Sequence, residues 1–461
     1  MLFNSLPFLF LFLPLTYCVF WRLTSKRARY IWLTATGYVF YAFWNYRFCA
    51  LMALSTAVSY FAGLGFLRWE QPRARRICLT VPIAFDLLLL GIFKYANFGF
   101  AALGRLAHAL HLPLAPPHLD IILPVGISFY TFHTITYIVD CYRRVIVPTR
   151  NFFEFSCYVS LFSQLVAGPI VRFREIEKDL EHLDQPDSAA LLETGCSFFI
   201  LGMIKKVIVA DTIATIINPA LANWRDLSSG GAWLCMLGYT YQLYFDFSGY
   251  SDMAVGLGMM FGLRLPQNFN SPYKALDIAD FWRRWHISLS RVLRDYLYIP
   301  LGGSRDGEVG TYRNLLVTML LGGLWHGANW TFVIWGGYHG SLLSVTRLYG
   351  ARIDRWNRTL RAVLTFLLVL IGWVLFRASD LGMARGLFRR LFWPSAGLLP
   401  AGLLLVPALL AAGALAHFGP NTFELRHQWT LSRRLALLLL FAVCLAIIYG
   451  GQQAPFLYYQ F

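Results

Sequence analysis

The sequence predicts an all-α, polytopic integral membrane protein, and three observations support this fold class. The first is composition: 57% of the 461 residues are hydrophobic and 14% are charged, whereas soluble domains contain about 25% charged residues. The second is the recurrence of long apolar runs along the whole chain. The third is the clustering of Lys and Arg in short segments between the runs, which is typical of membrane proteins. Together they exclude an ordinary soluble domain.

The apolar runs define the expected helices in chain order. A bilayer core about 30 Å thick requires roughly 20 apolar residues at a rise of about 1.5 Å each. The runs lie at residues 2–21, 30–44, 48–67, 77–93, 121–139, 152–170, 191–210, 232–247, 315–327, 331–345, 362–376, 398–416 and 435–448. Several are too short to span alone, so we expect about eleven transmembrane helices. The short runs that contain Gly or polar residues are expected to be re-entrant or broken where they line a cavity.

The basic residues predict the orientation of the first helix. No Lys or Arg precedes the first run, whereas Arg22, Lys26, Arg27 and Arg29 follow it, and a second basic cluster follows the third run at residues 68–76. Because such residues concentrate in cytoplasmic loops, we expect the N-terminus outside the cytoplasm. A cleaved signal peptide is not expected, since no basic segment precedes the run and no small-residue cleavage site follows it.

Charge and cysteine usage exclude two further classes. The net charge of +16 is interpreted as topological, with the basic residues meeting anionic lipid headgroups, and no nucleic-acid partner is expected. The eight cysteines are scattered, mostly within apolar runs and without a CxxC pair, which is typical of small core residues. No metal site is expected. No repeat or long linker divides the chain, so residues 1–461 are expected to form one membrane domain.

His286 is the first candidate site residue, because a titratable ring among apolar residues is costly and usually functional. If residues 280–297 form one helix, four of its charged residues form i,i+4 pairs and fall within roughly 60° of each other. These residues are Asp280, Arg284, Arg291 and Asp295. His286 then lies roughly 240° around from Asp280, on the apolar side of the helix.

His326 is the second candidate, and its surroundings are more apolar still. It follows an uncharged run at residues 317–325 and lies between Gly322, Gly323 and Gly327, which leave room for close backbone approach. Trp325 and Trp330 are expected to wall the ring from lipid. Burial without a neighbouring charge favours the neutral imidazole, which is the form that a general base requires.

The remaining histidines divide into two groups. For His133 and His339 a functional role and a structural role are both open. The others lie in or near polar connections and are expected to be solvated: His108, His111, His118, His182, His417 and His427.

Asp246 and Asp252, in DFSGYSD, are carboxylates within an apolar region. They can be catalytic, but such groups are more often paired, because an isolated charge there costs about 2.5–3.5 kcal/mol or more. We expect their partners among Arg264, Arg283 and Arg284.

Five sequence blocks occur in order and carry a family resemblance. They are LPVGISFYTFHTITYIVDCYRR (123–144), SQLVAGPIVRF (163–173), YFDFSGYSDMAVGLGMMFGLRLPQNFNSPY (244–273), FWRRWHISLSRVLRDYLYIPLGG (281–303) and GGLWHGANWTFVIWGGYHG (322–340). The set resembles the membrane-bound O-acyltransferases, in particular the bacterial branch that O-acetylates exopolysaccharides such as alginate and cellulose. The motif-rich core of the expected domain is residues 121–340.

The resemblance implies a fold, a site and a set of partners. Helices surround a thinned, central funnel in which a cytoplasmic acyl donor meets an acceptor from the other side. His326 matches the histidine that the family uses in catalysis, and His286 matches a second polar position facing the same passage. The donor implied is acetyl-coenzyme A, without a permanently bound cofactor. The implied partners are a periplasmic SGNH-like acetyltransferase and the polysaccharide synthase and export complex, in a bacterial inner membrane with the N-terminus periplasmic.

Acetyl transfer suits an imidazole. Moving an acetyl group from a thioester to a hydroxyl requires removal of the hydroxyl proton, and a positioned base contributes on the order of 10² to 10⁴ in rate. A covalent acetyl-histidine intermediate is the alternative. His286 can orient the acceptor, stabilise the thioester oxyanion or serve as a second transfer station. Direct transfer and relay through a partner both stay open, as does the identity of the polymer.

Two other function classes fit less of the sequence. A transporter or channel for a polar solute can use midplane His and Asp residues, but it predicts repeated halves with matching broken helices, and no such symmetry is visible. A scaffold that anchors a secreted polysaccharide enzyme accounts for the hydrophobicity and leaves the two histidines unexplained. The sequence therefore favours an O-acetyltransferase.

Overall fold

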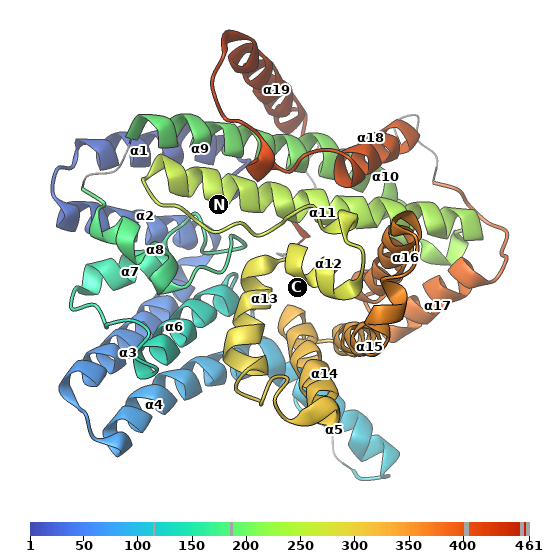
Figure 1. Ribbon diagram of the computed structural model, residues 1–461, viewed down its shortest axis with the longest axis horizontal. Coiled ribbons are helices and arrows are strands. Elements are labelled where there is room, and N and C mark those ends of the chain that lie inside the picture. Colours follow the sequence, from blue (N-terminus) through green and yellow to red (C-terminus); the bar gives the residue numbers. More distant parts are fainter. Residues whose placement is uncertain (114–115, 185–187, 401–404, 452–455, 458–461) are drawn as a thin grey trace. The chain divides into compact units, whose positions relative to one another are not determined.

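The structure is a computed structural model that describes residues 1–461 except 114–115, 185–187, 401–404, 452–455 and 458–461. Its described secondary structure is helical, and its one β contact there is an isolated bridge between Leu227 and Leu398 (Figure 1). The all-α prediction is therefore confirmed. The chain forms two compact units: unit 1 comprises residues 1–187 and 261–265, and unit 2 comprises residues 188–260 and 266–461.

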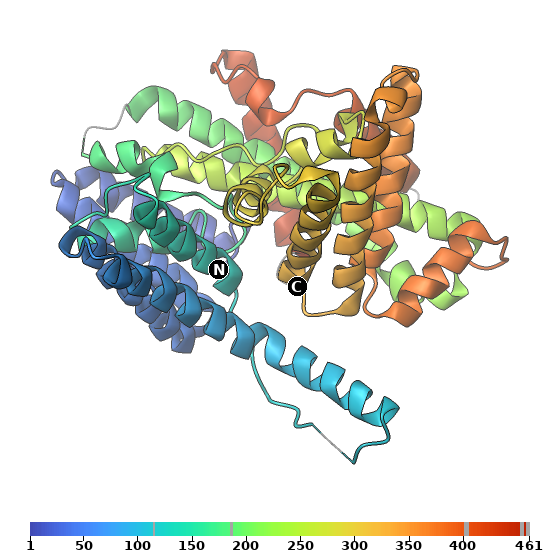
Figure 2. The same cartoon turned by 60° about the horizontal axis from the view of Figure 1, so that its bottom comes forward.

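Unit 1 contains the N-terminal helices. They are η1 (Phe8–Phe12), α1 (Leu13–Arg22), α2 (Lys26–Asn45), η2 (Tyr46–Phe48), α3 (Cys49–Arg68), α4 (Pro72–Leu90), η3 (Gly91–Tyr95), α5 (Ala96–Ala109), α6 (Ile127–Tyr142), α7 (Phe152–Ser160) and α8 (Phe173–Glu181). Helices α4, η3 and α5 follow one another as an almost continuous stretch, clearest in Figure 2. Buried phenylalanines form much of the core, with the rings of Phe12 and Phe162 5.3 Å apart edge to face.

A buried carboxylate joins three helices of unit 1. Asp86 of α4 accepts a hydrogen bond from Ser55 of α3 and another from Thr134 of α6, each at 2.6 Å. All three residues are buried. The two short hydrogen bonds compensate part of the cost of removing the carboxyl group from water.

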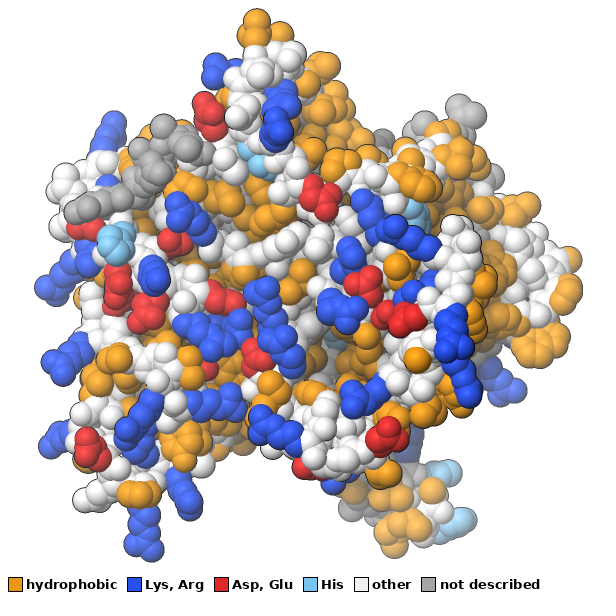
Figure 3. Space-filling model, viewed as in Figure 1, with side chains coloured by type: hydrophobic (Ala, Val, Ile, Leu, Met, Phe, Trp, Pro, Cys, Tyr) orange, Lys and Arg blue, Asp and Glu red, His pale blue; other side chains and the backbone are white. Residues whose placement is uncertain are grey.

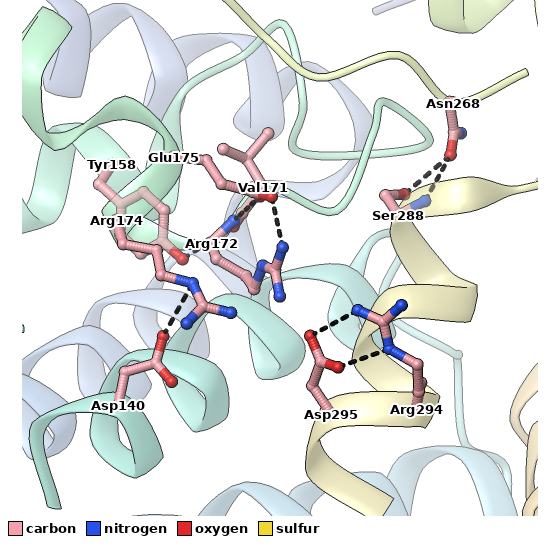
Figure 4. A network of polar contacts seen from close by, with 10 residues as sticks. All are labelled: Asp140, Tyr158, Val171, Arg172, Arg174, Glu175, Asn268, Ser288, Arg294 and Asp295. Atoms are coloured by element: carbon pink, nitrogen blue, oxygen red, sulfur yellow. Dashed lines mark hydrogen bonds and ion pairs between the residues drawn. The ribbon is translucent and has the colours of Figure 1, made fainter. Parts of the chain in front are cut away.

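Helix α8 shows how a polar interval packs in unit 1. Its apolar residues Phe173, Ile176 and Leu180 recur at helical spacing and are buried, while its charged residues Arg174 and Glu175 form ion pairs. Arg174 lies 3.6 Å from Asp140 of α6 (Figure 4). One face of the helix is therefore packed and the other is polar.

Unit 2 contains the remaining helices. They are α9 (Ser188–Met203), η4 (Ile204–Ala210), α10 (Asp211–Ala222), η5 (Trp224–Asp226), α11 (Ser229–Met260), η6 (Pro272–Lys274), α12 (Ile278–Arg284), α13 (Ile287–Leu293), η7 (Arg294–Tyr298), α14 (Gly307–His326), α15 (Trp330–Ile353), α16 (Arg358–Arg377), α17 (Leu381–Phe392), α18 (Leu405–His417), η8 (Thr422–Glu424) and α19 (Leu431–Tyr449).

Glycines allow two antiparallel helix pairs in unit 2 to approach closely. Where α9 crosses α11, a Cβ added at Gly202 would lie 2.5 Å from the carbonyl oxygen of Gly249. Where α14 crosses α15, a Cβ at Gly323 would overlap the Phe332 carbonyl oxygen, and one at Gly336 would overlap that of Met319. Only glycine permits such backbone contact, as is common in membrane helix pairs.

Four helical stretches in the described residues are long and apolar enough to cross a membrane. They are Lys26–Arg68, Pro72–Ala109, Arg358–Arg377 and Leu431–Tyr449. The first of them contains two of the expected runs, 30–44 and 48–67. The figure of about eleven spans stays a prediction.

Several expected runs are not helical over their full length, and two of them are 121–139 and 152–170. In run 121–139, helix α6 begins only at Ile127. The preceding Gly126 has a left-handed φ of 76°, a conformation that suits glycine and is not part of a regular right-handed helix. In run 152–170, helix α7 ends at Ser160, and the chain is irregular as far as residue 172. The bounds of these two apolar runs therefore do not coincide with the bounds of the helices.

The outside of unit 2 includes a strongly apolar helix. Leu431, Leu435, Leu438 and Leu439 of α19 are between 59 and 75% exposed, which suits contact with lipid. The viewed face in Figure 3 carries many exposed Lys and Arg side chains together with apolar areas. Such exposed basic side chains agree with contact to water and lipid headgroups.

Candidate active site

The segment around His286 is two helices with a break between them. Helix α12 ends at Arg284 and α13 begins at Ile287, while His286 itself has left-handed φ and ψ of 43° and 55°. The expectation of one helix over residues 280–297 was therefore wrong. Backbone groups near the break bond to a distant segment instead: Ile287 N–H donates to the Asn268 carbonyl, and Asn270 N–H donates to that of Arg284, both at 2.9 Å.

Part of the expected charged stripe is present. Arg284 lies 3.0 Å from Asp280, as the i,i+4 spacing predicts. In the second half, Arg294 lies 2.7 Å from its neighbour Asp295 (Figure 4), a contact that helical spacing does not predict. Because the helix breaks between the two pairs, they do not form one continuous stripe on one helix.

The His286 ring is completely buried in unit 2. Its Nδ1 lies 3.1 Å from Oδ1 of Asn268, and the ring of Phe247 from α11 contacts it edge to face at 4.7 Å. The ring is thus held from one side by a polar group and from another by an aromatic ring.

His326 is the last residue of α14 and is 4% exposed. Trp325, Trp335 and Phe376 pack edge to face on its ring, at centroid distances of 5.0, 5.2 and 5.2 Å. The expected aromatic wall is therefore present, and Trp335 of α15 and Phe376 of α16 contribute to it. Trp330, also expected to wall the ring, is 39% exposed.

The structure brings the two candidate histidines together. The ring centroids of His286 and His326 are 6.4 Å apart, and Trp325 contacts both rings. They come from different elements, one at a helix break and the other at a helix end. This separation exceeds a direct hydrogen bond and suits two groups that act on one reacting centre.

His339 lies in an aromatic enclosure near His326. Its ring is fully buried and contacts Trp282 at 5.3 Å and Trp335 at 4.9 Å. Neither of its ring nitrogens has a hydrogen-bond partner in the described part of the chain. Trp335 contacts the imidazoles of both His326 and His339. Among the described residues, His339 has no hydrogen-bond partner with which to exchange a proton.

His133 is placed in α6 of unit 1, fully buried beside Tyr158 at 5.4 Å. Of the histidines expected to be solvated, His108, His111, His118 and His182 are exposed. The expectation was wrong for the other two. His417 is partly buried with Nε2 3.1 Å from the Tyr241 hydroxyl, and His427 is partly buried with Nε2 2.9 Å from the Thr422 carbonyl oxygen.

Asp246 and Asp252, the two carboxylates of the apolar helix α11, are both paired, as expected, but with lysines. Asp246 lies 2.5 Å from Lys206, and its second oxygen accepts the Leu457 N–H at 3.0 Å. Asp252 lies 2.6 Å from Lys205. The expected arginine partners were wrong, since η4 packs on α11 and brings adjacent lysines to successive turns of that helix.

Sequence reasoning missed the lysine pair and Asn268. Lys205 and Lys206 interrupt the apolar run 191–210, and charged residues inside such a run are themselves a signal of buried pairing. Asn268 gave no comparable signal, because its role depends on contact with residues 18 and 20 positions further on. Among the described residues, no group of three or more His, Cys, Asp or Glu side chains is placed to hold a metal ion.

Comparison with known proteins connects this geometry with a family. The family model described as membrane-bound O-acyltransferase matches residues 142–378, which include both candidate histidines. The chain is 42% identical to "Probable alginate O-acetylase AlgI" of Azotobacter vinelandii over all of both chains. It is 45% identical to the Pseudomonas aeruginosa protein of the same name, over 92% of this chain and 82% of that one. It is 39% identical to "Peptidoglycan O-acetyltransferase" of Helicobacter pylori, over 83% of this chain and 78% of that one.

Proposed function

This chain belongs to the membrane-bound O-acyltransferase family, and we propose that it passes acetyl groups from a cytoplasmic donor toward hydroxyls of an exported polysaccharide. The donor we propose is acetyl-coenzyme A, and the acceptor is an alginate- or cellulose-type polymer. The observation that carries the proposal is the pair of buried imidazoles, His286 and His326, 6.4 Å apart. Similarity to proteins named as alginate O-acetylases supports the acceptor class. Membership of an acyltransferase family also argues against the alternative function, a transporter or channel for a polar solute.

We propose His326 as the general base. An acceptor hydroxyl oxygen attacks the thioester carbonyl carbon while the hydroxyl proton passes to the imidazole. A C–O bond forms, the C–S bond breaks, and the proton leaves with the departing thiolate as a thiol. The aromatic rings around His326 exclude water, which protects the thioester from hydrolysis. An acetyl-histidine intermediate uses the same ring as nucleophile and gives the same products in two steps.

His286 is proposed as the second group of the site. It faces the same reacting centre and acts on the acceptor or on the acetyl group, so its loss lowers the rate less completely than loss of the base. We further propose that both units form one membrane domain, residues 1–461, with about eleven spans around a central funnel and a periplasmic N-terminus. A periplasmic SGNH-like acetyltransferase and the polysaccharide synthase and export complex are the proposed partners.

The test of the function is polymer acetylation by His326 variants. We expect His326→Ala and His326→Gln to lower the rate of acetyl transfer by a factor on the order of 10² to 10⁴, and with it the acetyl content of the polymer. The level of inserted protein is expected to be unchanged. His286→Ala is expected to lower it less.

His427→Ala is the matched control, because this ring is partly buried and packs on Phe198, outside the candidate site. It is expected to acetylate normally. Normal acetylation by both His326 variants would overturn the assignment.

A further inference from the structure

Asn268 holds His286 from the segment that follows α11. The Asn268 side chain is 1% exposed. Its Oδ1 accepts hydrogen bonds from the backbone N–H and the hydroxyl of Ser288, at 3.2 and 2.8 Å (Figure 4). The same Oδ1 lies 3.1 Å from Nδ1 of His286, and Nδ2 donates to the Ser251 hydroxyl at 3.2 Å. One amide group therefore contacts Ser251 of α11, Ser288 of α13 and His286 in the break before α13.

These contacts fix which atom of the amide faces His286. A backbone N–H can only donate, so the Asn268 atom opposite the Ser288 N–H must be the carbonyl oxygen and not the NH₂ group. An amide oxygen can only accept. The His286 nitrogen that faces it must therefore carry the proton.

The tautomer of His286 follows directly. A neutral imidazole carries one proton, and its position is set by the hydrogen bond that one of the nitrogens makes. With the proton on Nδ1, the lone pair is on Nε2. His286 then presents a hydrogen-bond acceptor and potential nucleophile at Nε2, and not a donor.

The backbone reinforces this orientation. The left-handed conformation of His286 is unfavourable for a non-glycine residue, by about 1–3 kcal/mol. It is held because Ile287 N–H donates to the carbonyl of Asn268 itself, at 2.9 Å. The side chain and the backbone of Asn268 thus fix the proton position and the direction of the same ring.

We propose that Asn268 is a positioning residue that fixes His286 in the Nδ1–H tautomer, so that Nε2 accepts a hydrogen bond from the acceptor hydroxyl or attacks the acetyl group. The role in acetyl transfer rests on the proposed function, whereas the tautomer does not. Oxyanion stabilisation requires a donor, so this tautomer excludes neutral His286 from that role.

The tautomer is measured by ¹⁵N and ¹³C solid-state NMR of histidine-labelled protein in lipid bilayers, near neutral pH. The signal missing from His286→Gln assigns the ring. We expect neutral His286 with the proton on Nδ1, and loss of that preference in Asn268→Leu. A proton on Nε2 in the unaltered protein would overturn the proposal.

A second experiment measures the acetyl-transfer rate of two Asn268 variants, and its pH dependence, in inner-membrane vesicles supplied with acetyl-coenzyme A. Asn268→Leu removes the acceptor and is expected to lower the transfer rate at least about 10-fold, since lost orienting partners and wrong tautomers cost from about 10-fold to 10⁴-fold. Asn268→Asp keeps an acceptor, and its charge stabilises the imidazolium. The acidic limb of its pH–rate profile is therefore expected to move to higher pH. A merely structural residue would lower the level of folded protein and leave this limb in place, and that result would contradict the proposal.

Asn270→Ala is the matched control, because Asn270 lies in the same segment and its side chain bonds to Asn421, while its contact with the helix break is made by the backbone N–H, which alanine keeps. It is expected to leave the NMR signal and the pH–rate profile unchanged. If His286→Ala and His326→Ala both acetylate normally, the proposed function fails, and the NMR measurement still decides the tautomer.

Discussion

Lys206 lies between two buried carboxylates, and this arrangement predicts an order of stabilities. Its Nζ is 2.5 Å from Asp246 and 2.8 Å from Asp211, and all three side chains are at most 4% exposed. The group contains one cation and two anions. Replacing one of the anions therefore leaves the lysine paired, whereas replacing the lysine leaves two buried carboxylates without this cation.

The loss in the free energy of unfolding for each substitution depends on which contacts the other buried charges keep. Removing one partner of a buried ion pair destabilises by about 3–5 kcal/mol. In Asp246→Asn, Asp211 still pairs with Lys206, and the amide oxygen can still accept the Leu457 N–H, so we expect the lower end, about 3 kcal/mol. In Lys206→Met, two carboxylates lose their cation together, so we expect the upper end of about 5 kcal/mol or more.

The assay is thermal unfolding of the purified protein in detergent, with the inserted amount and the acetylation per folded molecule measured in parallel. The unaltered protein should be the most stable, then Asp246→Asn, then Lys206→Met. Asp306→Asn is the control, because its exposed pair with Arg313 at 3.8 Å should contribute little. If the Lys206→Met protein is as stable as the Asp246→Asn protein, the argument that loss of the shared cation costs more than loss of one anion is refuted. Well-folded Asp246→Asn that binds donor but fails to transfer acetyl would place Asp246 in the catalytic set.

Three further predictions concern topology, packing and the third histidine. Cysteines placed at Ser5 and Ser25 should differ in labelling from outside intact inner membranes, with only the first marked, and labelling of Ser25 alone would reverse the proposed orientation. Gly336→Leu should lower the amount of inserted protein several-fold, because a Cβ there overlaps the Met319 carbonyl oxygen, whereas an unchanged amount would show that α14 and α15 do not pack as described. His339→Met should keep normal acetylation, because neither nitrogen of His339 has a hydrogen-bond partner among described residues, and lost acetylation at a normal protein level would give His339 a functional role.

The sequence was sufficient to single out the two histidines as candidates but not to predict their geometry. Both were recognisable because a titratable ring in apolar sequence is costly and must be compensated. Their 6.4 Å separation was not predictable, since it depends on the break at His286. Near that break, Ile287 N–H donates to the Asn268 carbonyl and Asn270 N–H donates to the Arg284 carbonyl. No periodicity within residues 280–297 contains this information.

The paired carboxylates show a similar limit. Charge and burial were enough to predict that Asp246 and Asp252 need cations. The choice of partner failed because the expected cations were all arginines that follow α11 in the sequence. The actual partners, Lys205 and Lys206, lie about 40 residues earlier and reach α11 through the packing of η4 against it. Two adjacent lysines in an apolar run were the available signal, because such charges also require a buried partner.

Both candidate catalytic rings occur where a helix stops, and this has a physical reason. Within a continuous helix a side chain is directed by its neighbours at i±3 and i±4, so its direction is tied to the helix face. His286 has left-handed backbone angles between α12 and α13, and His326 precedes Gly327, whose backbone is extended. Each ring can therefore be aimed by tertiary contacts: Asn268 and Phe247 for His286, and Trp335 and Phe376 for His326. Irregular backbone inside a membrane protein is tolerated only where protein or a cavity satisfies its polar groups. Of the hydrogen bonds that satisfy the break at His286, the one donated by Ile287 N–H is accepted by Asn268, the same residue that holds the imidazole. The helix break and the direction of the ring therefore share a cause.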